Sequence, residues 1–197
     1  MGIHRAGPRS LESGHHENRL SYLLDSVRWR RFDMGTLYEY LAGDHERLND
    51  LLTRAAEGER GIDMGPYTEF RQGLLRHIGI EEKIVLPAIA RFQNGKQAEI
   101  AQRLRLDHGA LVALLVPPPT PAIVETIRLI LKAHNPLEED EGGLYELIEK
   151  LAGEEADGLL EKLKTAPEVP ALPHNDWPGV IDATRRAVER AGYNPAF

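Results

Sequence analysis

Apolar residues recur at helical spacing from about residue 34 to residue 151, and the alternation typical of strands is scarce in this region. Breaks rich in glycine, proline or asparagine divide the region into four apolar stripes. Before the last stripe, Thr120 and Pro121 supply an N-cap and a first helical residue. The pattern predicts an all-α protein, folded as an up-down-up-down four-helix bundle. The stripes are marked by Leu37, Leu41, Leu48 and Leu52; Phe70, Leu74, Ile84 and Ala88; Ile100, Leu104, Leu111 and Leu115; and Ile123, Ile127, Ile130, Tyr145 and Ile148.

The two ends of the chain differ from the bundle in composition. A short amphipathic helix is predicted at 17–33, and two more at 154–164 and at about 178–191. The last two are joined by a proline-rich segment at 165–178. We expect these short helical extensions to cover the bundle rather than to carry chemistry. The predicted division is residues 1–33 as N-terminal extension, 34–152 as bundle and 153–197 as C-terminal extension.

Composition excludes several classes of function. Acidic residues outnumber basic ones by 31 to 24, and the net charge of −7 disfavours nucleic acid or an anionic membrane as the partner. Cysteine is absent, which excludes disulfides, thiolate catalysis, iron–sulfur clusters and cysteine-ligated zinc. The sequence shows neither a secretory signal nor a long uncharged apolar run, so we expect a cytoplasmic protein without membrane association.

Polar side chains interrupt the apolar stripes at positions that should face the core. One histidine falls on each stripe, and a glutamate follows four residues later in HIGIEE (77–82) and in HNPLEE (134–139). Each of these two motifs is preceded by an Asp-His pair, at 44–45 and at 107–108. The chain therefore contains an internal duplication. The core positions concerned are His45, His77, Glu81, His108, His134 and Glu138.

A buried polar cluster of this size requires partners. Burying one unpaired amide or hydroxyl group costs roughly 2–7 kcal/mol, and a bare carboxylate costs more. A hydrogen-bonded His–Glu network is one solution, but one histidine on each helix of a duplicated pattern favours a metal site. Four imidazoles and two carboxylates exceed the ligands of one tetrahedral zinc and suit two bridged ions. A ferritin-type site would need Glu-x-x-His in the bundle, and that spacing occurs only at Glu12 and His15, outside it.

These residues resemble the hemerythrin, or HHE cation-binding, domain family over about 34–151. The likeness lies in the single histidines, the two His-x-x-x-Glu motifs and Leu86-Pro87 shortly after the first. It implies a non-haem centre of two iron ions, bridged by carboxylates and by an oxo or hydroxo oxygen, that binds dioxygen or nitric oxide. The metal ligands implied are His45, His77, Glu81, His108, His134 and Glu138.

The sequence departs from the family pattern at two positions. Oxygen-carrying hemerythrins have a second histidine one turn along the third helix, where this chain has Val112. We expect Val112 to keep the neighbouring space dry, and the unfilled metal positions to favour sensing or scavenging over oxygen transport. Pro136 is expected to kink the fourth helix, which leaves Glu139 as an alternative bridge. The duplication favours Glu138, because it matches Glu81.

Residues beside the six core positions are given lesser roles. Asp44 and Asp107 could hydrogen-bond the outer nitrogen of another ligand, although a solvated helix face is the favoured interpretation. Glu82 is interpreted as exposed or as a supporting residue. Tyr38 could line the site or simply pack in the core. The remaining histidines, expected to be solvated, are His4, His15, His16 and His174.

Other functions remain possible at the same cluster. The first alternative is a di-iron enzyme acting on peroxide, nitric oxide or oxygen-derived species, and the second is metal storage or iron homeostasis. No catalytic group stands out beyond the ligands, so a binding protein is favoured over an enzyme. The iron–sulfur repair branch of the family carries a cysteine-bearing region that this chain lacks. A sensing role would need a separate protein partner, which the sequence does not identify.

Overall fold

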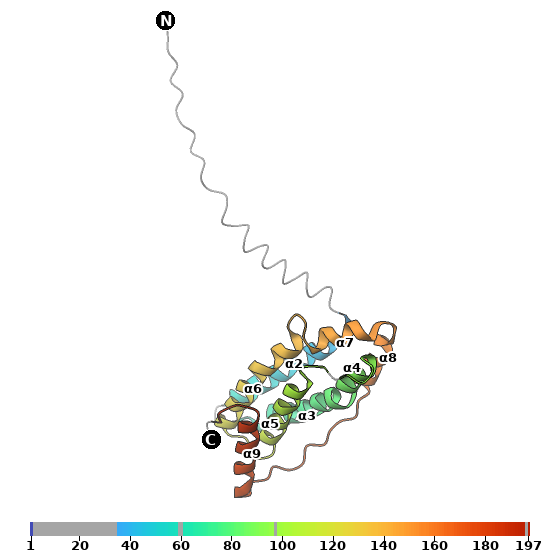
Figure 1. The fold of residues 1–197 in the computed structure, drawn as a ribbon. Coiled ribbons are helices and arrows are strands. Elements are labelled where there is room, and N and C mark those ends of the chain that lie inside the picture. Colours follow the sequence, from blue (N-terminus) through green and yellow to red (C-terminus); the bar gives the residue numbers. More distant parts are fainter. Residues whose placement is uncertain (2–34, 59–60, 97, 196) are drawn as a thin grey trace. The chain divides into compact units, whose positions relative to one another are not determined.

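Helices are the regular structure of this protein, and the described residues include no strand. The computed structural model describes residues 1, 35–58, 61–96, 98–195 and 197, so the predicted helix at 17–33 lies outside them. Residues 35–197 form one unit (Figure 1). Its α-helices are α2 (Thr36–Ala56), α3 (Met64–Ile80), α4 (Leu86–Phe92), α5 (Ala101–Leu114), α6 (Pro121–Glu139), α7 (Leu144–Ala152), α8 (Ala156–Lys164) and α9 (Pro178–Arg190).

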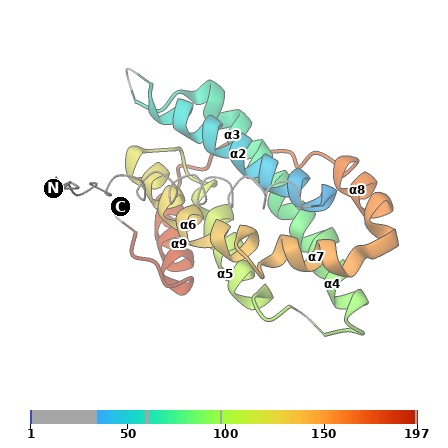
Figure 2. The same cartoon turned by 90° about the horizontal axis from the view of Figure 1, so that it is seen from above.

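The predicted four-helix bundle is confirmed. Its members are α2, the continuous run from α3 into α4, α5, and α6 with α7. Figure 2 shows α2 beside α3, and α9 against the outer part of the bundle near α5 and α6. The helices predicted at 154–164 and at about 178–191 correspond to α8 and α9. No helix in the described part of the chain is long and apolar enough to cross a bilayer.

Local sequence explains where the helices begin. Asp63 caps α3 by accepting a hydrogen bond from the Gly65 N–H at 2.9 Å. Thr120 caps α6 in the predicted manner, since its hydroxyl oxygen accepts from the Ile123 N–H at 3.2 Å. The first amides of α2 are capped by a residue far along the chain: the carboxylate of Glu149 on α7 accepts from the N–H groups of residues 37 and 38. This last contact ties the start of the first bundle helix to α7.

A π-helical turn at Glu81–Val85 separates α3 from α4 within one continuous helix. Its wider ring is closed by the Leu86 N–H, which donates to the carbonyl of Glu81. Pro87 has no N–H to donate to the carbonyl four residues earlier, so the α-helical pattern cannot continue unchanged through this point. The turn thus begins at one of the two core glutamates, and such turns are frequent at functional sites.

The apolar core consists of two clusters with the polar residues between them. One contains Leu48, Leu74 and Leu111, and the other contains Leu41 and Leu104. Along each bundle helix, the core histidine therefore stands where one cluster gives way to the other. This placement shields the histidines from water on both sides along the bundle axis.

The C-terminal segment is fastened to the bundle by polar contacts as well as by packing. Val188 of α9 is fully buried in the first apolar cluster, and the Thr184 hydroxyl donates to the carbonyl of Ala113 at 3.1 Å. In the segment between α8 and α9, the carbonyl of Leu172 accepts from the guanidinium of Arg71 on α3 at 2.5 Å. The same guanidinium donates to the carbonyl of Leu115 at the end of α5 at 2.8 Å. The proline-rich segment thereby lies against α3.

Candidate metal centre

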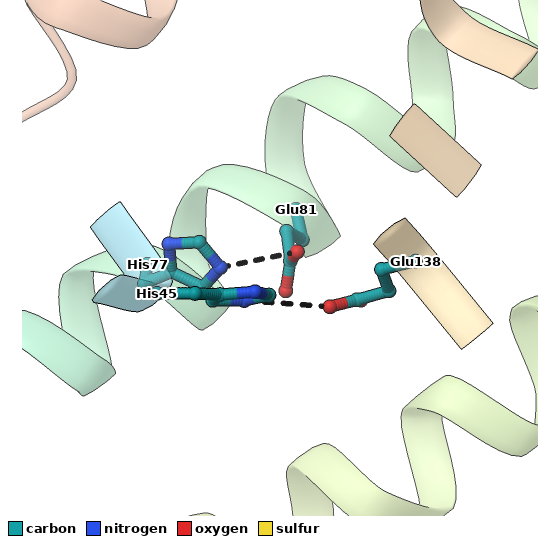
Figure 3. A group of neighbouring side chains, drawn as sticks. All are labelled: His45, His77, Glu81 and Glu138. Atoms are coloured by element: carbon teal, nitrogen blue, oxygen red, sulfur yellow. Dashed lines mark ion pairs between the residues drawn. The ribbon is translucent and has the colours of Figure 1, made fainter. Parts of the chain in front are cut away.

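The structure brings together all six residues that the sequence predicted as ligands. The histidines project from α2, α3, α5 and α6, and all six side chains are buried. Their ligand atoms form two groups that share both glutamates. One group is His45, His77, Glu81 and Glu138, shown in Figure 3, and the other is Glu81, His108, His134 and Glu138.

Each glutamate lies between two imidazoles. The Nε2 atom of His77 lies 3.2 Å from Oε1 of Glu81, and that of His108 lies 3.1 Å from Oε2. Around Glu138, Oε2 lies 3.5 Å from Nε2 of His45 and 3.3 Å from Nε2 of His134, while Oε1 lies 4.0 Å from Nε2 of His108. Every histidine therefore presents the same ring nitrogen to a central carboxylate. Carboxylates in such positions are able to bridge two metal ions.

The outer nitrogen of every histidine meets a different carboxylate. A carboxylate facing a neutral imidazole can only accept, so Nδ1 carries the hydrogen and Nε2 keeps its lone pair toward the centre. Partners of this kind fix the orientation of ligand histidines and raise their basicity. The Nδ1 to oxygen pairs are His45 with Glu139 at 2.5 Å, His77 with Asp44 at 2.9 Å, His108 with Glu82 at 2.8 Å and His134 with Asp107 at 3.4 Å.

The outer pairs follow the internal duplication. Within each repeat, the aspartate of the Asp-His pair binds the histidine of the His-x-x-x-Glu-Glu motif. Between repeats, the second glutamate of that motif binds the histidine of the other repeat's Asp-His pair. The two halves of the sequence thus form equivalent halves of one site. The favoured expectation that Asp44 and Asp107 face solvent was wrong, since Asp107 is fully buried and both bind histidines.

Arginines accompany three of the four outer carboxylates. The guanidinium nitrogens of Arg47, Arg103 and Arg105 lie 2.8, 2.7 and 3.2 Å from an oxygen of the outer carboxylate that each one binds. Their partners are Asp44, Asp107 and Glu82 respectively. These cations offset part of the negative charge gathered around the histidines.

Without metal, three histidines of this cluster, His77, His108 and His134, hold protons strongly. Burial by itself lowers the pKa of His77, but the charges of Glu81 and Asp44 outweigh burial and raise it to about 10. Against the same effect of burial, neighbouring carboxylates raise the pKa of His108 to about 9 and that of His134 to about 10. Burial favours the neutral form of Glu81, yet His77 and His108 hold its pKa well below the usual range. A metal ion must therefore displace protons from these rings.

Three ligand atoms inside the cluster have no hydrogen-bond partner among the residues that the structure describes. They are Oε2 of Glu81, Nε2 of His108 and Oε1 of Glu138, and all are buried. The His108 nitrogen lies 3.1 Å from the first of these oxygens and 4.0 Å from the second. When His108 is neutral, as metal ligation requires, none of the three can donate a hydrogen bond to another. An unsatisfied buried polar atom costs about 1–3 kcal/mol, and a cation between the three would satisfy them together. Imidazole nitrogen and carboxylate oxygen suit iron and related transition metals.

The family model of the hemerythrin HHE cation-binding domain matches residues 36–188. The chain belongs to this family. The match extends beyond the four bundle helices and includes α8 and most of α9. No curated protein and no solved structure matches the chain. The protein is accordingly a helical, cation-binding HHE domain whose buried His/Glu cluster can hold metal, while the role of each residue as a ligand stays a prediction.

Tyr145 is part of this HHE site, although the sequence placed it among the core residues of the fourth stripe. Its fully buried hydroxyl donates to Oε1 of Glu81 at 2.6 Å, and burial, together with the neighbouring carboxylates, raises its pKa well above the usual value of 10. The sequence did hold a signal for this position, because Tyr145 follows Glu138 by two helical turns and would share its face in a continuous helix. The turn at 140–143, however, interrupts the helix between them.

Expectations for other residues of the HHE domain had mixed outcomes. Val112 is 36% exposed, so the expectation that it keeps the site dry was wrong. Pro136 lies inside α6, which continues to Glu139, and the kink expected there stays a prediction. The hydroxyl of Tyr38 donates to the carbonyl of Glu139 at 2.9 Å, and its ring packs edge-on against Tyr145. His174 lies beside Tyr67 and belongs to neither ligand group, whereas residues 4, 15 and 16 lie outside the described part.

A cavity of about 430 Å³ reaches the centre beside His45. Its walls come from α2, α3 and α6 and are largely apolar, with Leu48, Leu74 and Leu131 among the lining residues. Lys132 and Arg128 also line it. The cavity is of a size that holds small molecules, and it brings them to one histidine of the cluster.

Proposed function

We propose that this HHE domain holds two iron ions and binds dioxygen or nitric oxide there, for sensing or scavenging. The observation that carries the proposal is the sharing of both glutamates by two pairs of histidines. His45 and His77 would hold one ion, and His108 and His134 the other. Glu81 and Glu138 would bridge them. Two iron ions held in this way supply the redox chemistry by which such centres take up diatomic molecules.

The protein's own residues prepare the site for this role. The outer carboxylates hold each imidazole with Nε2 directed inward, so that the ligand positions exist before metal arrives. The two apolar clusters exclude water from above and below the site. The cavity beside His45 supplies a path along which a small uncharged molecule can diffuse.

Sensing or scavenging is supported over bulk transport by the number of histidines. The centre has four, with no fifth histidine at Val112, so histidine side chains fill fewer positions on the pair of ions. A less saturated centre is more easily oxidised after it takes up dioxygen. Bulk transport of dioxygen would need the opposite property, a bound form that persists and releases dioxygen unchanged.

The test is to load the protein with iron, reduce it, and record visible and electron paramagnetic resonance spectra under nitrogen, dioxygen and nitric oxide. We expect a spectral response to each gas, and the response to dioxygen should decay to the oxidised protein. The variant Leu129→Ala, changed at an exposed site on α6, is the matched control for effects of purification and iron loading. Absence of any response in iron-loaded protein would overturn gas binding, and a stable, fully reversible response to dioxygen would instead support transport.

A further inference from the structure

The hydroxyl of Tyr145 lies among the ligand atoms of one half of the cluster. Its oxygen is 2.6 Å from Oε1 of Glu81 and 3.2 Å from Oε2 of Glu138. The same oxygen is 3.1 Å from Nε2 of His45 and 3.2 Å from Nε2 of His77. These four partners are the complete first ligand group, drawn in Figure 3. One phenol oxygen therefore contacts every proposed ligand of one ion.

Hydrogen bonding alone does not account for these contacts once the imidazoles are neutral, as metal ligation requires. In that state the Nδ1 hydrogens of His45 and His77 point to the outer carboxylates, and the Nε2 atoms can only accept. Ionised Glu81 and Glu138 also only accept. A phenol has a single hydrogen, so it can satisfy one of the four acceptors. A cation shared by all five atoms removes the mismatch.

The contact distances match those between ligands of one metal ion. Neighbouring ligands of a six-coordinate ion lie about 3 Å apart when the bonds to the metal are about 2.1 Å long. The four contacts of the Tyr145 oxygen range from 2.6 to 3.2 Å. The oxygen thus stands at a corner that neighbours all four other ligand atoms.

The turn between α6 and α7 places Tyr145 in this position. A Cβ atom on Gly143 would lie 2.6 Å from the carbonyl oxygen of Glu138, so the close return of the chain requires glycine there. The rings of Tyr38 and Tyr145 pack edge-on with centroids 6.1 Å apart, which fixes the tyrosine from the other side. The oxygen is therefore positioned by packing as well as by its polar contacts.

Among the residues that the structure describes, no tyrosine oxygen takes the corresponding place in the second half of the cluster. At the same offset from Glu81 as Tyr145 has from Glu138, the first repeat carries Ala88. The ligand atoms without a hydrogen-bond partner in the described residues include Nε2 of His108, in the half that Tyr145 does not reach. The duplication is thus broken at this pair of positions.

We propose that Tyr145 is a fifth protein ligand of the iron held by His45 and His77, in addition to those two histidines, Glu81 and Glu138. Tyr145 binds through its phenolate oxygen. The O–H bond breaks, the proton passes to solvent, and no electron is transferred. This inference rests on the proposed di-iron function, and its test separates the two.

The experiment compares iron-loaded, oxidised wild-type protein with Tyr145→Phe and with Tyr38→Phe, the matched control. Iron content is measured by elemental analysis, and resonance Raman spectra are recorded in the visible absorption band. Wild-type and Tyr38→Phe protein should show tyrosinate ring vibrations that shift when ring-deuterated tyrosine is incorporated. Tyr145→Phe should lose these vibrations and the band while it keeps most of its iron.

The outcomes are distinct. Wild-type protein that holds iron but shows no deuterium-sensitive tyrosinate signal would overturn the role of Tyr145 and leave the di-iron function standing. Retention of that signal in Tyr145→Phe would assign it to another tyrosine and also overturn the proposal. Failure of the wild-type protein to hold iron would overturn both. Should Tyr145→Phe not fold, as judged by circular dichroism, Gly143→Ala is expected to weaken the signal by displacing the tyrosine, and an unchanged signal would contradict the proposal.

Discussion

The Nδ1 atom of His45 lies 2.5 Å from Oε1 of Glu139, the residue that directly follows the central glutamate Glu138. The Nε2 atom of the same ring lies 3.5 Å from Oε2 of Glu138. Two consecutive glutamates therefore meet opposite sides of one imidazole. The side chain of Glu138 is fully buried, whereas that of Glu139 is 33% exposed. This geometry supports Glu138 as the bridging residue and Glu139 as the residue that orients His45.

Substitution of these two glutamates should have unequal effects. Glu138→Ala should lower the iron content of the purified protein markedly, because it removes a ligand shared by both ions. Glu139→Ala should retain both ions but weaken their affinity roughly tenfold to a hundredfold, as expected for loss of a residue that supports a ligand. Elemental analysis after dialysis against a graded series of chelator concentrations measures both effects. The reverse ranking would make Glu139 the bridge.

The six inner residues could be predicted because helical periodicity is a local property. A histidine such as His45, placed between Leu41 and Leu48 on one stripe, must share the buried face of those leucines whatever the tertiary arrangement. The cap at Thr120 was predictable for the same reason. Neither inference depends on how one helix is oriented against another.

The outer carboxylates could not be predicted in this way. Asp44 and Asp107 each stand one residue before a core histidine, about 100° around the helix, where a residue faces either solvent or a neighbouring helix. Only the packing of the bundle decides between these, and it places both aspartates against histidines of other helices. The place of Tyr145 in the site could not be predicted because the turn at 140–143 breaks the helix after Glu138, so helical spacing no longer says which way residue 145 points. The expectation that Val112 keeps the site dry was wrong because the buried face of α5 passes through residues 104, 108 and 111 and leaves residue 112 outside it.

The metal-free protein should lose stability as the pH rises above neutrality. The folded pKa of His77 is about 10, above the unfolded value of 6.5, and those of His108 and His134 are about 9 and about 10. A raised pKa contributes stability that is complete below the unfolded value and is lost as the pH passes through the folded value. Thermal unfolding between pH 6.5 and 10 should therefore show a falling midpoint for metal-free protein.

Iron-loaded protein should show little of this slope, because its imidazoles are already neutral and bound. His77→Gln in the metal-free state should flatten the slope in part, which links the effect to the cluster rather than to the net charge. A midpoint of metal-free wild-type protein that rises over the same pH range would contradict the account.

Metal binding should release protons. Three histidines hold a proton at pH 7 in the metal-free protein, so loading should release about three protons per chain from these rings, and binding of Tyr145 as phenolate would add about one more. Isothermal titration calorimetry of iron(II) binding under nitrogen, repeated in buffers of different ionisation enthalpy, gives this number directly. A release near zero would mean that the rings are neutral before metal arrives.

Narrowing the cavity beside His45 should slow gas uptake without removing the metal. Leu131 lines the cavity, whereas Leu129 lies on the same helix and is 48% exposed. Leu131→Trp should lower the association rate of nitric oxide with reduced, iron-loaded protein several-fold, while Leu129→Trp should leave it unchanged. Stopped-flow absorbance measures both rates. Equal rates in the two variants would show that the gas reaches the centre by another path.

The most direct test of the central claim is the number of ions that the protein holds at saturation. Iron-loaded protein, freed of excess metal by gel filtration, is analysed for iron and for protein by elemental analysis and amino-acid analysis, and native mass spectrometry counts the ions per chain. The two ligand groups that share Glu81 and Glu138 predict about two irons per chain, falling to about one in His108→Ala. A saturated ratio near one in the wild-type protein, or two ions retained normally in His108→Ala, would contradict a dinuclear centre.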